Sequence, residues 1–507
     1  MSLRAARPLR RRAILSFFVA ASLAGSAFAT APESSLRPLL KPGDAEKRAV
    51  TSASTIMKES GLGGHISFVV ADAATGEVLE RHSALRAHPP ASVTKAVTAL
   101  YALETLGADY RFSTLLMGTG PIANGVLKGD LILAGDGDPV LTSDDLLDLA
   151  SAMKDAGVAS VDGRFLIYDA ALPWVREIDT AQPIQVGYNP GVSGLNLNFN
   201  RVFLEWTPQG GDYSVTLEAR SERVRPDVSV AQAEVVEGSG PVFTYEQTPS
   251  GEFWTVNRKA LGKKKGGRWL PVRGPGAYAG DVMQTLARSH GIVIRAPQRI
   301  ADLPDGAETI VTHESPELEE IVRDMLKYST NLTAEALGLR ASGARSLPGS
   351  GAAMSEWAKS RFGARRPDFA DHSGLGDQTK LTAFDMTRML TAPGAQTLLA
   401  PLLKELRVLD AKGDLDTSSG RRIFAKTGTL NFVSGLAGYV TTPQGRDLAF
   451  AIYTSDLERR SKLSRAERER PRGARGWNSR SRRMQQRLIA RWSTLYSDLD
   501  QKAELTE

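Results

Sequence analysis

The sequence predicts an α/β fold in which an antiparallel sheet, flanked by helices, is interrupted by a large β-rich insertion. Strand-like segments joined by short turns lie near both ends of the chain, at 66–80 and 422–454, as is typical of antiparallel hairpins. Apolar runs with helical character occur at 92–106 and 318–326. The stretch between them, 107–285, instead contains short alternating strands separated by Gly, Pro and Asp turns.

The composition excludes several classes of protein. The chain has 507 residues, of which 42% are apolar and 24% charged, and it has no cysteine. These shares exclude a collagen-like chain, a coiled coil or a wholly disordered chain. Without cysteine there are no disulfides, no thiolate catalysis and no Cys-based zinc sites. The six His form no HxxxH or HxH pair, so we do not expect a zinc hydrolase.

The segment before the insertion begins with a predicted hairpin. Residues 66–72 form its first strand, 72–76 a turn and 77–80 the returning strand. A His-Pro-Pro break at 88–90 then precedes the helix-like run that starts at Ser92.

The insertion is predicted to be mostly strands. One helix, 143–156, interrupts them, and 262–268 is a polar loop rich in Lys and Gly. The segments with alternating strand character are 127–133, 164–168, 195–206 and 214–218.

Helices and strands follow the insertion. Apolar residues from Leu318 to Leu326 have helical spacing, and a second helix is predicted at 333–347. The strands are predicted at 422–429, 433–439 and 448–454. A final apolar stripe predicts a C-terminal helix docked on a core; it consists of Met484, Leu488, Ile489, Trp492 and Leu495.

The first 29 residues have the pattern of a secretory signal peptide. Five arginines and no acidic residue precede a short apolar stretch, 13–24, and a small-x-small site ends at Ala29. A bilayer span needs ~20 apolar residues, which disfavours an uncleaved anchor. We therefore expect export to the periplasm with cleavage after Ala29. The pair Arg11-Arg12 faintly resembles a twin-arginine signal, and the export route stays open.

A strongly basic segment lies near the C-terminus. From Arg459 to Arg491 there are thirteen Lys or Arg and two acidic residues. We expect a solvated basic face, with weak attraction to anionic lipid or an envelope polymer as the alternative. No nucleic-acid motif accompanies the segment, so nucleic-acid binding is not expected.

Three short motifs carry the candidate chemistry. Ser92-Val93-Thr94-Lys95 opens a predicted helix, Ser329-Thr330-Asn331 follows another, and Lys426-Thr427-Gly428 lies on a predicted strand. Each motif alone is weak evidence, but all three occur in this order, each on the expected kind of element.

The first motif suits nucleophilic catalysis. Ser92 at the start of a helix is near free backbone N–H groups and the positive end of the helix dipole, and Lys95 lies one turn further on the same face. A serine hydroxyl needs a base to become a nucleophile, and the sequence has no plausible triad His. Lysine can serve only if its pKa falls from ~10.4, and burial or a second cation such as Lys426 lowers it.

A second Ser-x-x-Lys occurs at Ser151-Ala152-Met153-Lys154. It lies inside a polar helix pattern with no chain break before it, so we assign it to a solvated helix face.

The three motifs together resemble those of penicillin-binding proteins and serine β-lactamases. Lys95 and Ser329 lie 234 positions apart, which is similar to the class C low-molecular-weight penicillin-binding proteins, D-Ala-D-Ala carboxypeptidases and endopeptidases. Further matching segments are 131–139, 195–200 and 371–375. The resemblance implies the penicilloyl-serine transferase fold, with a discontinuous catalytic domain, 30–106 and 286–507, around an inserted domain at 107–285.

The resemblance also implies catalytic roles. Ser92 would be the acylated nucleophile, Lys95 its base, and Ser329 the group that relays a proton to the leaving D-Ala amine. Asn331 would hold the substrate amide. Peptidoglycan stem peptides would be the substrates and β-lactams covalent inhibitors, with no cofactor or metal.

Further residues of the third motif would bind substrate. The resemblance implies that Lys426 and Thr427 hold the terminal carboxylate, and that the backbone N–H groups of Ser92 and Thr429 form an oxyanion hole. Gly428 is expected to let the substrate backbone lie against the strand edge.

The sequence departs from the family at several positions. Asp377 stands where relatives have an Arg that holds a side-chain carboxylate, and an Asp would repel that group. Asp169 is either the acid that meets a side-chain ammonium in relatives or an ordinary turn residue. His372 replaces a usual Gly, and we interpret it as a packing residue rather than a catalyst.

Three other functions stay open at this stage. A β-lactamase would need a deacylating base and is not expected to have so long an insertion. A non-catalytic cell-wall binding protein would be expected to have lost a motif residue, and all are present. A polyanion-binding protein would act through the basic segment.

Overall fold

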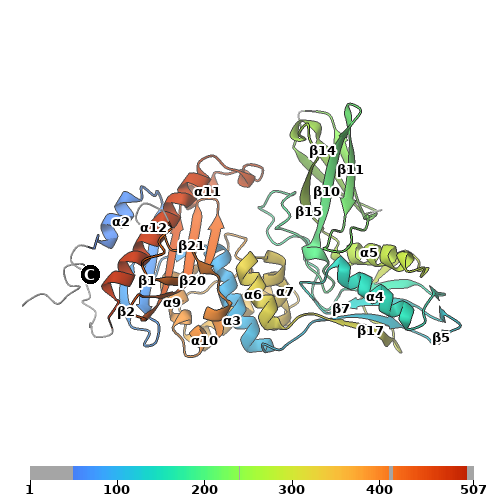
Figure 1. Cartoon of the computed structure of the whole chain (residues 1–507), viewed down its shortest axis with the longest axis horizontal. Helices are drawn as coiled ribbons and strands as arrows, with labels where there is room; N and C mark the ends of the chain where they lie inside the picture. The colour runs from blue at the N-terminus through green and yellow to red at the C-terminus, as the bar shows by residue number, and fades with distance from the viewer. Residues whose placement is uncertain (1–49, 239, 250, 410–414, 499–507) are drawn as a thin grey trace, which may run out of the picture. The chain divides into compact units, whose positions relative to one another are not determined.

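The computed structural model describes residues 50–238, 240–249, 251–409 and 415–498 (Figure 1). The predicted signal peptide, 1–29, lies outside these residues. None of the helices in the described ranges is long and apolar enough to cross a membrane.

The central sheet joins segments from both ends of the chain, and all its neighbouring strands are antiparallel. The predicted hairpin at 66–80 therefore pairs with the three strands predicted at 422–454. In sheet order, the described strands are β19 (Glu405–Leu406), β20 (Arg422–Leu430), β21 (Val433–Thr441), β22 (Asp447–Ser455), β1 (His65–Asp72) and β2 (Val78–His82).

Both faces of this sheet are buried, because its strands are apolar in successive positions. In β1, Val69 packs into a core with the helices of one face, whereas its neighbours Phe68 and Val70 belong to the core of the other face. Side chains alternate across a strand, so adjacent residues must enter different cores. The sheet is thus the middle layer between two groups of helices (Figure 1).

One face is covered by α2 (Ala53–Glu59) and α12 (Ala474–Leu495). In α12, four residues of the predicted stripe, Met484, Leu488, Ile489 and Trp492, are buried there, which confirms the docked C-terminal helix. The helices on the other side are α3 (Thr94–Leu106), α6 (Leu318–Tyr328), α7 (Asn331–Ser342), α8 (Leu347–Phe362), α9 (Ala383–Leu390) and α10 (Ala395–Leu399).

The predicted end of the helix at 333–347 is wrong. Helix α7 stops at Ser342 because Gly343 adopts a left-handed conformation with φ of 63°, which favours glycine and terminates helices. Helix α8 starts after Ser346, whose side chain accepts a hydrogen bond from the Gly349 N–H. The sequence analysis missed this second helix.

The insertion contains several sheets. Its largest sheet, in order, consists of β16 (Pro297–Ile300), β9 (Phe165–Tyr168), β7 (Leu131–Gly135), β4 (Ser113–Gly118) and β17 (Glu308–Glu314). Strands β16 and β17 follow residue 285, so this sheet extends beyond the predicted end of the insertion. The domain boundaries themselves stay a prediction.

Smaller sheets complete the described part of the insertion. Helices α4 (Ser143–Asp155) and α5 (Pro275–Ser289) pack on its core. One sheet is β11 (Asp212–Glu218), β10 (Arg201–Gln209) and β15 (Gly266–Pro271). A second is β12 (Ala231–Val236), β14 (Gly251–Asn257) and β13 (Phe243–Thr248). A third is β5 (Ile122–Ala123), β6 (Val126–Leu127) and β8 (Ser160–Val161).

Three predictions for the insertion are corrected. The strand predicted at 127–133 is two strands, β6 and β7, separated by a turn. The strand predicted at 195–206 begins only at Arg201, because 198–200 have positive φ and the side chain of Asn200 bonds the Leu197 N–H. Helix α5 was missed: its Gly- and Ala-rich start reads as a turn, but Pro275 at its first position favours a helix start.

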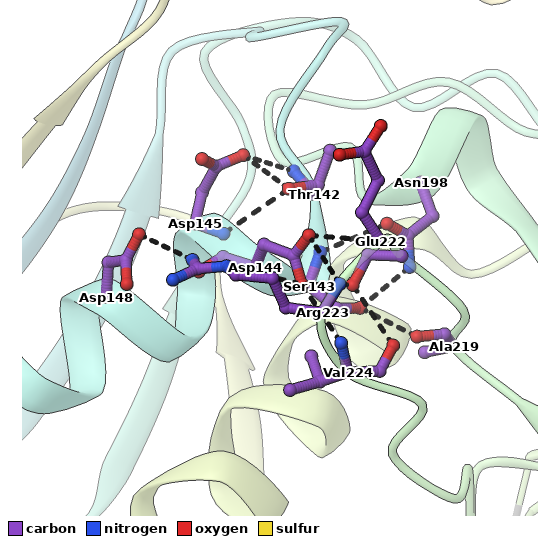
Figure 2. A network of polar contacts seen from close by, with 11 residues as sticks. Thr142, Ser143, Asp144, Asp145, Asp148, Asn198, Ala219, Glu222, Arg223 and Val224 are labelled. Carbon is purple, nitrogen blue, oxygen red and sulfur yellow. Dashed lines mark hydrogen bonds and ion pairs between the residues drawn. The ribbon is translucent and has the colours of Figure 1, made fainter.

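A carboxylate at the start of α4 holds a distant loop of the insertion (Figure 2). Asp144 accepts hydrogen bonds from the Ser221 hydroxyl and from the backbone N–H groups of Glu222, Arg223 and Val224. Nearby, Thr142 and Asp145 form a capping box. These contacts satisfy N–H groups that a helix start and a loop would otherwise leave unpaired.

The turn that carries Ser92 packs directly on two glycines of the central sheet. Gly428 and Gly435 are cross-strand partners in β20 and β21. A Cβ at Gly428 would lie 2.5 Å from the Pro90 carbonyl oxygen, and a Cβ at Gly435 would lie 2.8 Å from it. This close packing by itself requires glycine at both positions. Contact between Gly428 and substrate stays a prediction.

We predict that Gly428→Ala lowers the free energy of unfolding by ~1–3 kcal/mol, because the added methyl group overpacks the contact between the sheet and the turn that carries Ser92. Gly262→Ala is the matched control, since a Cβ at Gly262 would meet nothing within 4 Å. Chemical denaturation of both variants measures the difference. Equal stability of the two variants would contradict the packing role of Gly428.

Candidate functional site

Ser92 lies in a short 3-10 turn, Ala91–Val93, that leads directly into α3. Ala91 before it has a φ of 50°, a conformation that is costly for a residue with a side chain. The turn is held by its contacts: Val93 N–H bonds the Pro90 carbonyl, and the Thr94 hydroxyl bonds the Ala91 carbonyl at 2.9 Å. The α-helix predicted at 92–106 therefore begins only after this 3-10 turn. Ser92, which lies in the turn, is half-buried.

Lys95 lies one turn further along and is fully buried. Its Nζ lies 3.1 Å from Ser92 Oγ, 2.7 Å from Asn331 Oδ1 and 2.8 Å from the Ser373 carbonyl oxygen. Burial first, and the positive charge of Lys426 second, hold the pKa of Lys95 well below its ordinary value. Lys95 therefore meets the requirement that the sequence analysis set for a base.

The three contacts of Lys95 also aim its lone pair. A neutral amine has two N–H donors and one lone pair. Asn331 Oδ1 and the Ser373 carbonyl are acceptors only, and both are closer to Nζ than Ser92 Oγ is. They take the two N–H groups, so the lone pair points at the Ser92 hydroxyl. This is the arrangement in which an amine can accept the serine proton.

Buried acids hold the segment that supplies the Ser373 carbonyl. Glu335 on α7 accepts hydrogen bonds from the backbone N–H groups of His372 and Ser373, both at 2.9 Å. Asp371 accepts from the N–H groups of Gly374 and Gly376. Burial raises the pKa of both carboxyl groups.

His372 is a core residue, as predicted. It is fully buried, and its Nε2 lies 2.6 Å from the Ser350 hydroxyl. Burial lowers the pKa of His372 to about 3, so the ring is neutral. Its carbonyl accepts a hydrogen bond from Thr98 on α3, which ties this segment to the helix that carries Lys95.

The second motif lies in the tight turn between α6 and α7. Ser329 ends α6 in the left-handed conformation, with φ of 62°, and Asn331 begins α7. This change of direction brings Asn331 to Lys95 and Ser329 to Lys426. Asn331 Nδ2 donates to the carbonyl of Tyr188, a residue of the insertion, at 2.8 Å.

Lys426 on β20 is the second buried amine. Its Nζ donates to Ser329 Oγ at 2.9 Å and to the Thr427 carbonyl at 3.0 Å. Burial first, and then the charge of Lys404, lower the pKa of Lys426 to about 7. Near neutral pH this amine can thus exist in either protonation state beside the Ser329 hydroxyl.

Three residues of the first two motifs, Ser92, Ser329 and Asn331, line one cavity of about 270 Å³. Thr429 of β20 also lines it. The described lining residues are Ser92, Gln182, Tyr188, Ser329, Asn331, Leu375, Thr429, Leu430, Asn431, Arg460, Arg468, Glu469 and Asn478.

Two predicted binding residues lie elsewhere. Thr427 lines a neighbouring hollow of about 370 Å³, together with Arg482 and Arg483 of α12. Asp169 does not line the Ser92 cavity: it is 2% exposed and forms an ion pair with Arg299, its Oδ1 lying 2.6 Å from Nε.

The carboxylate of Asp377, which was expected to repel a side-chain carboxylate of the substrate, is paired with a cation. Asp377 forms an ion pair with Arg460, with 2.9 Å between Oδ2 and Nε. Burial raises the pKa of Asp377, but the hydrogen bond and charge of Arg460 outweigh it and the pKa is lowered. Arg460 thus balances the negative charge of the Asp377 carboxylate. Its guanidinium, from a distant segment of the chain, lies beside Asp377.

Some polar atoms of the cavity residues are unpaired. Arg460 Nη2, Arg468 Nη1 and Asn478 Oδ1 are buried and have no hydrogen-bond partner among the described residues. Buried N–H groups are seldom left unpaired. Two cationic donors without acceptors favour an anionic group in this part of the cavity.

The basic segment is only partly the solvated face that was predicted. Arg460 is buried, and Arg465, Arg487 and Arg491 form ion pairs with Glu177, Glu59 and Glu80. Several others are exposed: Arg459, Lys462, Arg470, Arg472, Arg475, Arg480, Arg482 and Arg483. The second Ser-x-x-Lys behaves as predicted, since Lys154 is exposed on α4.

Sequence analysis missed several residues of the site. Glu335 was detectable, because it lies four positions after Asn331 on one helix and so on the same face. Arg460 was hidden among other arginines. The carbonyls of Tyr188 and Ser373 had no sequence signal, since every residue has a carbonyl.

Comparison with known families gives a match over most of the chain. Residues 50–470 match the model of the D-Ala-D-Ala carboxypeptidase 3 (S13) family. The D-alanyl-D-alanine carboxypeptidase of Actinomadura sp. strain R39 is 29% identical over 444 residues, covering 78% of this chain and 79% of the relative. D-alanyl-D-alanine carboxypeptidase DacB of Haemophilus influenzae is 24% identical over 439 residues, covering 79% and 88%.

Solved structures show the same mixed α/β fold. Penicillin binding protein 4 (dacB) of Haemophilus influenzae superposes with a TM-score of 0.68 at 20% identity, covering 88% of this chain and 100% of the other. The same protein in complex with a novel β-lactam gives a TM-score of 0.64 at 21% identity, covering 89% and 100%. The predicted fold class is therefore confirmed.

The site, a serine hydroxyl 3.1 Å from a buried amine of lowered pKa, agrees with the match to this family. The chain belongs to the D-Ala-D-Ala carboxypeptidase 3 (S13) family and is a serine-type D-Ala-D-Ala carboxypeptidase.

Proposed function

We propose that the protein cuts peptidoglycan stem peptides at the terminal D-Ala or at a D-Ala cross-link, through an acyl-enzyme on Ser92. The observation that carries this proposal is the buried amine of Lys95, whose two carbonyl acceptors leave its lone pair for the Ser92 hydroxyl. The same serine would be acylated by β-lactams. The proposed steps use no cofactor and no metal.

Acylation begins when Ser92 Oγ attacks the carbonyl carbon of the penultimate D-Ala and its proton passes to Lys95 Nζ. The carbonyl oxygen becomes an oxyanion, bound by the backbone N–H groups of Ser92 and Thr429. One such donor contributes roughly 3–4 kcal/mol to lowering the barrier. The C–N bond then breaks, and the leaving amine needs a proton.

Ser329 is placed to deliver that proton. Its hydroxyl accepts from Lys426 Nζ at 2.9 Å, so it can donate its own proton to the amine and recover one from Lys426. The pKa of Lys426, lowered to about 7, suits such an exchange near neutral pH. After acylation Lys95 carries the Ser92 proton and Lys426 lacks one, so the net transfer of one proton from Lys95 to Lys426 through solvent restores both amines. Water then hydrolyses the ester on Ser92, with Lys95 again as the base.

The outer edge of β20 can bind the substrate backbone. Strand β19 pairs only with Ile423 and Phe424 of β20. Within the described residues, the edge from Lys426 to Leu430 therefore has no strand beside it. A peptide can add there as an extra strand, which supports the proposed roles of Lys426 in holding its terminal carboxylate and of Thr429 in holding its carbonyl. The role of Thr427 in binding the carboxylate has no such support, because its side chain lines the other hollow.

Arg460 and Arg468 support a preference for a second, side-chain carboxylate. Both residues line the Ser92 cavity, and each has a buried N–H group with no hydrogen-bond partner among the described residues. Asp169 remains the weaker candidate for side-chain binding, because Arg299 already pairs with it.

We also propose that the protein acts in the periplasm after cleavage at Ala29, on the strength of its signal-peptide pattern. The exposed arginines of α12 support weak association with an anionic envelope surface.

The first prediction concerns the acyl-enzyme. A brief pulse of benzylpenicillin should add one penicilloyl group to the purified protein, and Ser92→Ala should take up none. Intact-mass spectrometry followed by peptide mapping measures this. Absence of an adduct would indicate a non-catalytic relic of the fold, and an adduct lost within seconds while penicillin is consumed would indicate a β-lactamase.

The second prediction concerns pH. Because only neutral Lys95 accepts a proton, acylation should slow as pH falls through its lowered pKa. The charge of Lys426 lowers that pKa further, so Lys426→Met should raise it and move the acid limb of the profile to higher pH. Lys154→Met, at the second Ser-x-x-Lys, should leave the profile in place. If the acid limb of the pH profile does not move in Lys426→Met, the proposed effect of the Lys426 charge on the pKa of Lys95 is contradicted.

The third prediction concerns the anionic subsite. The double variant Asp377→Asn/Arg460→Gln should lower kcat/KM for a substrate with a free side-chain carboxylate by about ten- to hundredfold, the equivalent of one charge-assisted hydrogen bond. The amidated peptide should be cut normally. Asp377→Asn alone and Arg470→Gln are the controls, and both should retain the preference. Equal losses on the two peptides would argue against the subsite.

A further inference from the structure

Among the described residues, a backbone carbonyl of the insertion is hydrogen-bonded to a catalytic side chain. The Tyr188 carbonyl accepts a hydrogen bond from Asn331 Nδ2 at 2.8 Å, while Oδ1 of the same amide accepts from Lys95 at 2.7 Å. A carbonyl can only accept, so it fixes which end of the amide faces Lys95.

The orientation of this amide decides where the lone pair of Lys95 points. With Oδ1 toward Lys95, the amide takes one N–H group of the amine. If the amide turned over, its Nδ2 would donate into the lone pair, and an N–H group of Lys95 would face Ser92 instead. The Ser92 hydroxyl would then have no base, although every catalytic side chain would still be present.

We infer that Tyr188 is a positioning residue for acylation: its carbonyl, held by the loop 182–190 of the insertion, locks the Asn331 amide so that Lys95 can deprotonate Ser92. The inference rests on the proposed role of Lys95 as the base. It gives the insertion a part in the chemical step itself, in addition to any contact with the peptide.

The loop that carries Tyr188 is held by a buried arginine. Arg273 is 3% exposed, lies just after β15 and donates to the carbonyls of Ile184 and Asn189. It also forms an ion pair with Glu177 at 3.5 Å. Arg273 thus grips the backbone on both sides of Tyr188.

A second set of contacts closes the loop on itself. The side chain of Asn189 accepts from the Asp179 N–H and donates to the Asp179 carbonyl, both at 2.9 Å. Gln182 donates to the Asp179 carboxylate at 2.8 Å. These bonds act on the same turn through contacts that do not involve Arg273.

The segment after β22 braces the loop from the catalytic side. Arg465 donates to the Gln182 carbonyl, and Glu469 accepts from Gln185 Nε2 and from Arg268 at 2.9 Å. The loop is therefore built into the fold at three points.

The test is acylation by benzylpenicillin, which reports the attack by Ser92 without the peptide substrate. Arg273→Met and Asn189→Ala release the loop by different contacts, and both should lower the acylation rate constant by about tenfold or more, within the range that a general base supplies. Stopped-flow or quenched mass spectrometry gives the rate.

The pH profile separates positioning from general loosening. Loss of the Oδ1 contact removes an acceptor from the Lys95 ammonium, so the acid limb should move to lower pH. Water entry into a loosened site would relieve burial and move it to higher pH. The charged groups facing Lys95 are Lys426 on β20, Glu335 on α7 and Asp371 before Ser373, and all are unchanged in these variants.

One variant is the control. Asp144→Asn loosens the insertion at the network of Figure 2, away from the loop, and should acylate normally. If Arg273→Met fails to fold, Asn189→Ala alone decides.

Normal acylation of Asn189→Ala and of folded Arg273→Met would overturn the inference, even if peptide cleavage fell. A slower rate with a limb moved to higher pH, or an equal loss in Asp144→Asn, would overturn it too. Failure of the wild-type protein to form an adduct is a different result, because it would reject the proposed function.

Discussion

The site depends on one buried amine. Lys95 is enclosed between the central sheet, α7 and the segment before Leu375, and two carbonyl oxygens take its N–H groups. Burial makes the charged form costly, and the nearby Lys426 makes it costlier. Both effects favour the neutral amine, and in that form its lone pair faces Ser92.

Much of the surrounding fold maintains that geometry. The glycine pair Gly428 and Gly435 lets the Ser92 turn lie directly on the sheet. Glu335 and Asp371 hold the backbone that presents the Ser373 carbonyl. Buried carboxyl groups are expensive, and their cost is offset here by several backbone N–H donors each. The acids are thus structural supports of the base.

The insertion and the basic segment meet at the same cavity. The loop 182–190 contributes Tyr188, and the segment after β22 contributes Arg460 and Arg468. Ion pairs and hydrogen bonds, among them Arg268–Glu469, join the two. A run of arginines that reads as a solvated surface in the sequence therefore includes residues that form a wall of the active site.

The sequence by itself determined the family resemblance, the three motifs, the central strands and the docked C-terminal helix, because these depend on local pattern and residue type. It misjudged the strand at 195–206 and missed α5 and α8, where local turns compete with helix or strand propensity. Only the tertiary structure decided that Asp377 is neutralised by Arg460, that Gly428 packs on the Ser92 turn, and that Tyr188 and Ser373 act through carbonyls. These contacts join residues far apart in the chain, and a backbone carbonyl has no residue identity from which a pattern could predict it.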